Sequence, residues 1–166
     1  MIETTRLILK PLTHEQLIKY IENDNSLELE LNKSTRIISS ELKEALEQTI
    51  VPNVADVTKN YLFSTLWTAI LKSENCMVGD LCFVGEPDEA GEVEIGYGTY
   101  EEFRQKGYMT EAVAGLIRWA STQPTIKAII AGTEKNNVAS FIVLEKNGFV
   151  KIGETEILWN WRLPLK

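Results

Sequence analysis

The spacing of apolar residues changes around Arg104, and this change constrains the fold more than any other feature of the sequence. Before it, the segments 61–72, 76–84 and 92–99 carry strand-forming residues and are joined by short turns, which predicts an antiparallel meander. After it, residues 108–121 carry apolar side chains at helical spacing, which predicts a helix with a buried stripe. The stripe consists of Met109, Ala112, Val113, Leu116, Ile117 and Ala120. The chain therefore combines a sheet with helices packed against it.

The C-terminal part continues this alternation. Pro124 prevents the helix from continuing, and residues 125–132 form a short apolar strand. Asn137 opens a second amphipathic helix that ends at Gly148, because glycine accepts the left-handed conformation of a helix C-terminus. Residues 149–163 are predicted to close the chain as a hairpin.

The N-terminal part begins with a strand over residues 5–10, which the following proline ends. Thr13 and Gln16 have the spacing of a capping box, which predicts a short helix to about Ile21.

Between residues 23 and 60 the pattern is weaker. Ser39 or Ser40 is predicted to begin a helix through Ile50, which Pro52 would end. The predicted order of elements is β-α-α-β-β-β-α-β-α-β-β, an α/β (α+β) arrangement.

Composition limits the classes of function. The 166 residues are 44% apolar and contain no linker or repeat, so they suffice for a single domain over residues 1–166. The net charge of −7 argues against nucleic-acid binding, which draws on a basic surplus. No apolar run is long enough to span a membrane, and Glu3 and Arg6 interrupt the run that a signal peptide needs. We expect a cytoplasmic protein that contacts neither nucleic acid nor membrane.

The sequence predicts no metal site. Cys76 and Cys82 lack a second pair of cysteine or histidine ligands, and both are interpreted as strand residues. His14 is the sole histidine and is expected to be exposed in the first turn of a helix.

The junction between the third strand of the meander and the following helix has the features of an anion site. It contains Gly107, flanked by the basic residues Arg104 and Lys106. A glycine there lets backbone N–H groups turn outward, and the first helical turn leaves several N–H groups without internal partners. These donors and the helix dipole suit a pyrophosphate, although the same pattern is found in ordinary turns.

Two segments together resemble the GNAT superfamily of N-acetyltransferases. The first is residues 104–112, and the second runs from residues 137–140 (NVAS) to residues 145–149 (EKNGF). Residues 5–12 and 94–97 are similar to the branch that includes the ribosomal-protein N-terminal acetyltransferases. The resemblance implies a mixed central sheet of about seven strands flanked by about four helices, with acetyl-CoA as cosubstrate.

The resemblance also implies which residues hold acetyl-CoA. The pyrophosphate loop corresponds to Arg104, Gln105, Lys106, Gly107, Tyr108 and Met109. Backbone groups of Tyr97, Gly98 and Thr99 correspond to those that bind the pantetheine arm, and Asn137 matches an Asn that hydrogen-bonds this arm. Met109 departs from the family pattern, which has Gly or Ala there.

Two catalytic roles are predicted. Glu94 matches the family's Glu two residues before Gly96 and is the favoured general base, although Glu92 lies on the same strand face and both suit solvated carboxylates. Leu144 stands where much of the superfamily has Tyr, so the resemblance to the ribosomal branch instead implies Ser140 as the donor to the leaving thiolate; a first-turn residue that bonds local backbone is the alternative.

The predicted function is acetyl transfer from acetyl-CoA to a primary amine, either a protein N-terminus or a small molecule. The alternative is an acyl-CoA sensor or docking module on the same fold. A nucleotide-binding domain of another type is disfavoured because its glycine-rich motifs are absent. The acceptor is left open, and the chain is expected to be a monomer or homodimer. The four tryptophans are interpreted as core or dimer packing residues; only Trp67 is also considered for the acceptor channel, because it follows the segment that borders this channel in the family.

Overall fold

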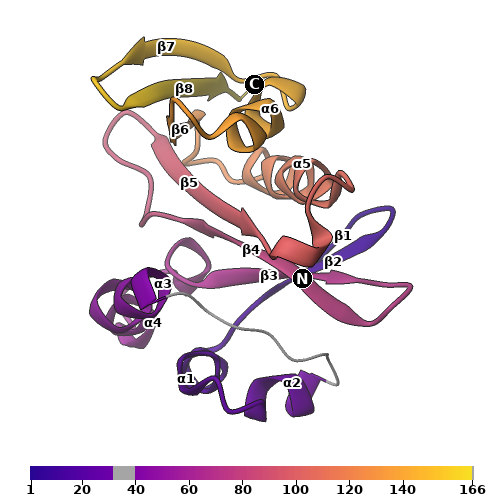
Figure 1. Cartoon of the computed structure of the whole chain (residues 1–166). Coiled ribbons are helices and arrows are strands. Elements are labelled where there is room, and N and C mark those ends of the chain that lie inside the picture. The colour runs from indigo at the N-terminus through magenta and orange to yellow at the C-terminus, as the bar shows by residue number, and fades with distance from the viewer. Residues whose placement is uncertain (32–39, 166) are drawn as a thin grey trace.

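The computed structural model describes residues 1–31 and 40–165 and contains one mixed sheet of eight strands (Figure 1). The strands lie in the order β1-β2-β3-β4-β5-β6-β8-β7. Every neighbouring pair is antiparallel except β5 and β6, which are parallel. The strands are β1 (Ile2–Glu3), β2 (Leu7–Pro11), β3 (Leu66–Leu71), β4 (Cys76–Phe83), β5 (Glu92–Thr99), β6 (Ala128–Glu134), β7 (Val150–Glu154) and β8 (Leu158–Pro164).

The helices fall into two groups in the sequence. Before β3 lie α1 (His14–Glu22), α2 (Ser26–Leu31), α3 (Ser40–Ala45), a π-helical turn (Leu46–Ile50), α4 (Val51–Ala55) and a 3-10 turn (Tyr61–Phe63). After β5 come a 3-10 turn (Glu101–Phe103), α5 (Tyr108–Ala120) and α6 (Val138–Lys146). Figure 1 shows α1 to α4 gathered at one end of the molecule, whereas α5 and α6 lie alongside β5 towards the β7–β8 hairpin. Within the described residues, no helix has the length and apolar character that crossing a membrane requires.

Most predicted elements are confirmed. Thr13 and Gln16 form both bonds of the capping box at the start of α1. The meander β3-β4-β5 is antiparallel, and α5 buries five of its six stripe residues, leaving Ile117 half-buried. Gly148 adopts φ 83° just after α6, as a C-terminal cap requires.

Two predicted boundaries are wrong. The helical path continues past Pro52 to Ala55, because this proline lies in the first turn of α4, where its missing N–H costs no helical hydrogen bond. The segment 61–72 begins as a 3-10 turn rather than a strand, and the Asn60 side chain caps this turn by accepting from the N–H of Leu62. Helix α2 was not predicted, and Ser39 lies outside the described residues.

The core consists of two clusters. The larger joins the sheet to the apolar stripe of α5, and the smaller packs the N-terminal helices on Leu66. Trp67 is only 1% exposed and packs against Trp119 at 5.3 Å between ring centroids. The interpretation of Trp67 as a packing residue is therefore confirmed, and a ring this buried presents no face to a ligand in an acceptor channel.

Glycine at position 79 is required for the close approach of β4 and β5. A Cβ there would lie 2.4 Å from the carbonyl oxygen of Gly98 and 2.9 Å from Met109 Cε. At Gly98, by contrast, a Cβ would have nothing within 4 Å.

We predict that Gly79→Ala lowers the free energy of unfolding by about 1–3 kcal/mol, because the β5 backbone must move to admit the methyl group. Gly98→Ala should change it by less than about 0.5 kcal/mol. Urea denaturation of the two variants measures both values, and equal values would contradict this description of the β4–β5 contact.

Candidate active site

The parallel strands β5 and β6 separate part-way along their length. Their pairing covers only Glu92 to Glu94 on β5, with Glu94 opposite Ile130 as the last pair. Beyond this point β6 continues along β8, while Ile95 to Thr99 of β5 pair with β4 alone. In the described ranges 1–31 and 40–165, one edge of β5 therefore has no neighbouring strand over residues 95–99, so its backbone groups there are available to a ligand.

Tyr97 reaches across this opening to α6. Its hydroxyl donates to the carbonyl oxygen of Ser140 at 2.7 Å, and the Ser140 hydroxyl donates to the Tyr97 oxygen at 3.3 Å. Burial raises the pKa of Tyr97 to about 12, so the phenol is neutral and remains a donor at physiological pH. Of the predicted arm-binding residues, Tyr97 thus brings its side chain as well as its backbone to the opening.

The loop before α5 exposes consecutive backbone donors. Gln105 and Gly107 adopt left-handed conformations with φ 60° and 77°, and the first helical bond runs from the N–H of Glu111 to the carbonyl of Gly107 at 3.2 Å. The N–H groups of residues 105–110 have no acceptor within the described part of the chain. Alternating backbone conformations of this kind form a concave set of N–H groups, and the N-terminus of α5 adds the positive end of its dipole.

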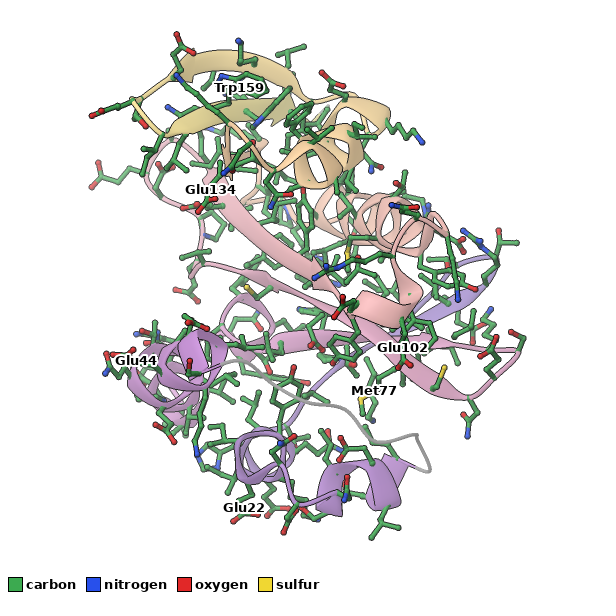
Figure 2. The ribbon with its side chains drawn as sticks, viewed as in Figure 1. Glu22, Glu44, Met77, Glu102, Glu134 and Trp159 are labelled. Carbon is green, nitrogen blue, oxygen red and sulfur yellow. The ribbon has the colours of Figure 1, made fainter. Side chains whose placement is uncertain are left out.

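The basic side chains of this loop extend outward. Arg104 and Lys106 are exposed. The Arg104 guanidinium donates to the carbonyl of Thr99 at 3.4 Å, and Lys106 Nζ lies 5.3 Å from the ring centre of Phe103. A 3-10 turn joins β5 to this loop, and Glu102, labelled in Figure 2, lies in this turn.

Met109 does not obstruct the loop. Its side chain is 5% exposed and belongs to the main core, where its Cε packs beside Gly79. The departure from the family pattern at this position is therefore accommodated in the interior.

Asn137 caps α6. Its side-chain oxygen accepts from the N–H of Ser140 at 3.1 Å. The residue is exposed, and its amide nitrogen has no acceptor among the residues that the structure describes. The cap thus leaves both N–H donors of the side-chain amide for a ligand.

The two candidate carboxylates differ in their surroundings. Glu92 accepts from Arg162 Nε on β8 at 2.7 Å. Glu94 is exposed at the point where β5 and β6 separate, and no ion pair joins it to another described residue. The geometry thus favours Glu94 over Glu92 as the proton acceptor, a distinction that strand alternation alone does not make.

A buried polar cluster was not predicted. The Asp80 carboxylate on β4 accepts from the hydroxyls of Tyr20 and Tyr100, the latter at 2.7 Å. Burial and the charge of Asp80 raise the pKa of Tyr100 well above its usual range. Asp80 lies opposite Gly98, on the strand face that also carries Glu94. Because 60 residues separate Tyr20 from Asp80, no local pattern indicates their contact.

A surface hollow of about 580 Å³ lies away from these groups. It is lined by residues of the β4–β5 turn and of the loop after α5, together with Asn60 and Phe63, and it contains none of the predicted site residues. The 13 residues of α5, spanning about 20 Å, separate it from the anion loop. Among the described residues, no three His, Cys, Asp or Glu side chains are placed to hold a metal ion.

Comparison with known families identifies this arrangement. Residues 6–150 match the model of the acetyltransferase (GNAT) domain. The chain belongs to the GNAT acetyltransferase family. The family resemblance of the sequence motifs is thereby confirmed, as is the GNAT fold.

Two uncharacterized N-acetyltransferases of Bacillus subtilis (strain 168) are similar to this GNAT chain. YjdG is 42% identical over 84 residues, which are 51% of this chain and 50% of YjdG. YnaD is 29% identical over 84 residues, or 51% of this chain and 49% of YnaD. The match therefore spans about half the length of these curated relatives.

Solved GNAT structures share the fold over nearly the whole chain. The ribosomal L7/L12 α-N-protein acetyltransferase RimL, in complex with coenzyme A, has a TM-score of 0.69 at 16% identity and covers 98% of this chain and 96% of its own. Spermidine N-acetyltransferase from Vibrio cholerae, in complex with CoA and spermine, has a TM-score of 0.66 at 14% identity and covers 97% and 96%. At these identities the likeness shows the fold alone.

Proposed function

We propose that this chain transfers the acetyl group of acetyl-CoA to a primary amine. The observation that carries the proposal is the run of N–H groups at residues 105–110, at the N-terminus of α5, for which the described residues offer no acceptor. These donors suit the charge of a pyrophosphate. The free edge of β5 over residues 95–99 leads from the separation of the strands towards this loop.

The residues present fit acetyl-CoA in two places. The loop from Arg104 to Met109 is proposed to hold the pyrophosphate through backbone N–H groups, with Arg104 and Lys106 adding positive charge. The backbone of Tyr97, Gly98 and Thr99 is proposed to bind the pantetheine arm, together with the free amide of Asn137. Gly98 supports this assignment because it leaves space beside the strand.

The main chemical task left to the protein is to deprotonate and position the amine. Acetyl-CoA supplies an activated thioester, so the protein can lower much of the activation barrier by positioning the amine and stabilising the charge that develops on the thioester oxygen. An amine with a pKa near 10.4 is neutral about once in 2,000 molecules at pH 7, a deficit of about 4–5 kcal/mol. We assign Glu94 as the group that takes this proton, directly or through water. The neutral nitrogen then bonds to the acetyl carbon. As the carbon–sulfur bond breaks, the nitrogen gives up a second proton and the leaving thiolate takes up one, so the products are the amide and the free thiol.

The leaving sulfur requires a hydrogen-bond donor. We assign this role to Ser140, whose single hydroxyl proton must turn from the Tyr97 oxygen, 3.3 Å away, to the leaving sulfur. The pair places two neutral hydroxyl groups between β5 and α6. Leu144 on α6 is fully buried and contributes no polar group.

The acceptor is proposed to be a cationic amine. The net charge of −7 attracts a positively charged acceptor before it binds. RimL and spermidine N-acetyltransferase, which share the fold, are named for a protein α-amine and a polyamine respectively. The second candidate function is an acyl-CoA sensor. It is favoured by the apolar Leu144, which leaves no Tyr at that position on α6. The Glu94 experiment below distinguishes a sensor from an enzyme.

We predict that Gly107→Val weakens acetyl-CoA binding at least tenfold, because a β-branched residue disfavours the left-handed conformation that aims the N–H groups. Gly85→Val is the matched control, since Gly85 has φ 88° in the β4–β5 turn and lies outside the loop. Isothermal titration calorimetry measures both. Unchanged affinity in Gly107→Val, or equal losses in the two variants, would contradict the assignment of this loop.

We predict that Glu94→Gln slows turnover about 100-fold or more while acetyl-CoA affinity stays within about twofold, because the amide cannot accept the proton. Turnover is followed by thiol release with a polyamine, an aminoglycoside and a basic N-terminal peptide. Glu92→Gln, on the same strand face but paired with Arg162, is the control and should retain most of the rate. A Glu94→Gln rate within about twofold of the original, less than about 0.5 kcal/mol of barrier, would exclude Glu94 as the base. No thiol release with any amine from a chain that binds acetyl-CoA would favour the sensor.

A further inference from the structure

One guanidinium group connects the N-terminal strands to the anion loop. Arg6 lies between β1 and β2, 100 residues from Lys106 in the sequence. Its Nε donates to Glu111 Oε2 at 2.6 Å, and its Nη1 donates to the carbonyl oxygen of Lys106 at 3.1 Å. Its Cζ lies 4.7 Å from the ring centre of Tyr108, within the range of a cation–π contact. A single side chain thus contacts the loop, the first residue of α5 and its first turn.

Glu111 is held by the same N-terminal segment. Its Oε1 accepts from the hydroxyl of Thr4 at 2.6 Å and from the backbone N–H of Arg6 at 2.7 Å. Partial burial acts to raise the pKa of Glu111, but the bonds from Thr4 and Arg6 outweigh it and lower that pKa. The carboxylate is therefore charged and fixed, and it orients the guanidinium that reaches Lys106.

The bond to Lys106 determines where the next N–H group points. In a trans peptide the carbonyl and the following N–H point in opposite directions, and the described residues contain no cis peptide. Arg6 holds the Lys106 carbonyl towards itself, so the N–H of Gly107 faces away from Arg6. Arg6 Nη2 lies 3.5 Å from the position of a Cβ on Gly107, so the guanidinium also lies against this residue.

We propose that Arg6 is a positioning residue for the pyrophosphate of the cosubstrate. With Glu111 it holds the loop in the conformation that directs the Gly107 N–H away from the protein and towards the anion. This inference rests on the proposed function. An exposed ion pair alone contributes little, so the role of Arg6 is to fix a backbone conformation rather than to add stability.

The test compares three variants by amide NMR titration. Arg6→Gln removes the charge and the pair of donors that bind Glu111 and the Lys106 carbonyl, Arg6→Lys keeps the charge, and Lys72→Gln is the control. Lys72 follows β3 and contacts Glu3 Oε2 at 3.2 Å and the carbonyl of Thr4 at 2.7 Å. Its loss removes a cation that binds the same N-terminal segment but does not contact the loop. Each protein is titrated with acetyl-CoA and with S-acetylpantetheine, which lacks the pyrophosphate, and its thermal unfolding is recorded.

We expect Arg6→Gln to lower the affinity for acetyl-CoA about tenfold or more, because the hydrogen bonds of a charged group that hold the loop are lost. The affinity for S-acetylpantetheine, which has no pyrophosphate, should stay within about twofold. Arg6→Lys should lower the acetyl-CoA affinity about threefold or more. A single ammonium group cannot reach both Glu111 and the Lys106 carbonyl, as the separate nitrogens of the guanidinium do. Arg6→Lys carries the test if Arg6→Gln does not fold. Lys72→Gln should bind both ligands as the unmodified chain does.

Acetyl-CoA affinity within about twofold in both Arg6 variants would overturn the inference. Equal weakening of the two ligands, or the same loss in Lys72→Gln, would also overturn it, since either result marks a general effect on the fold. An unmodified chain that binds no acetyl-CoA would overturn the proposed function itself, which is a different result from an Arg6 variant that binds normally.

Discussion

The separation of β5 from β6 after Glu94 is the constraint on which the rest of the site depends. A strand inside a sheet hydrogen-bonds on both edges, so a strand that loses one neighbour exposes a row of backbone groups. Here β4 stays paired with β5 through Thr99, which holds the free edge in place. The Tyr97 phenol then links this edge to α6 through Ser140. The opening is therefore framed by regular elements, which suits a site that must hold a long flexible ligand in one position.

The anion loop, unlike the β5 edge, has an irregular and strained backbone, and contacts with other parts of the chain hold it in place. A non-glycine residue in the left-handed region costs about 1 kcal/mol or more, and Gln105 adopts this conformation beside Gly107. N–H groups without protein acceptors forgo the stabilisation that a helix interior supplies. Core packing of Met109 and the contacts of Arg6 and Glu111 hold the loop from its protein-facing side, away from the exposed N–H groups. The loop is thus supported by contacts that do not occupy its N–H groups.

Much of the fold was predictable because its signals are local. The capping box of α1, the stripe of α5 and Gly148 after α6 each depend on residues within a few positions of one another. The path through Pro52 was mispredicted because a proline also suits the first turn of a new helical segment.

The site was predictable only in part. Family motifs indicated Glu94, Ser140 and the loop from Arg104 to Met109. The ion pair that distinguishes Glu92 from Glu94 involves Arg162, which lies 70 residues from Glu92 in the sequence. The contacts of Arg6 with Glu111 and of Tyr20 with Asp80 likewise join distant segments. No spacing rule relates such residues, so only the folded chain shows them together.

Binding of acetyl-CoA is the central claim, and thermal unfolding with and without this ligand tests it most directly. At about a hundredfold excess over Kd, a ligand that binds only the folded state adds about 2.7 kcal/mol of stability. For a domain of this size the account predicts a rise in Tm of about 5–10 °C with acetyl-CoA and none with ATP or NAD. No shift at millimolar acetyl-CoA, or an equal shift with ATP or NAD, would contradict the account.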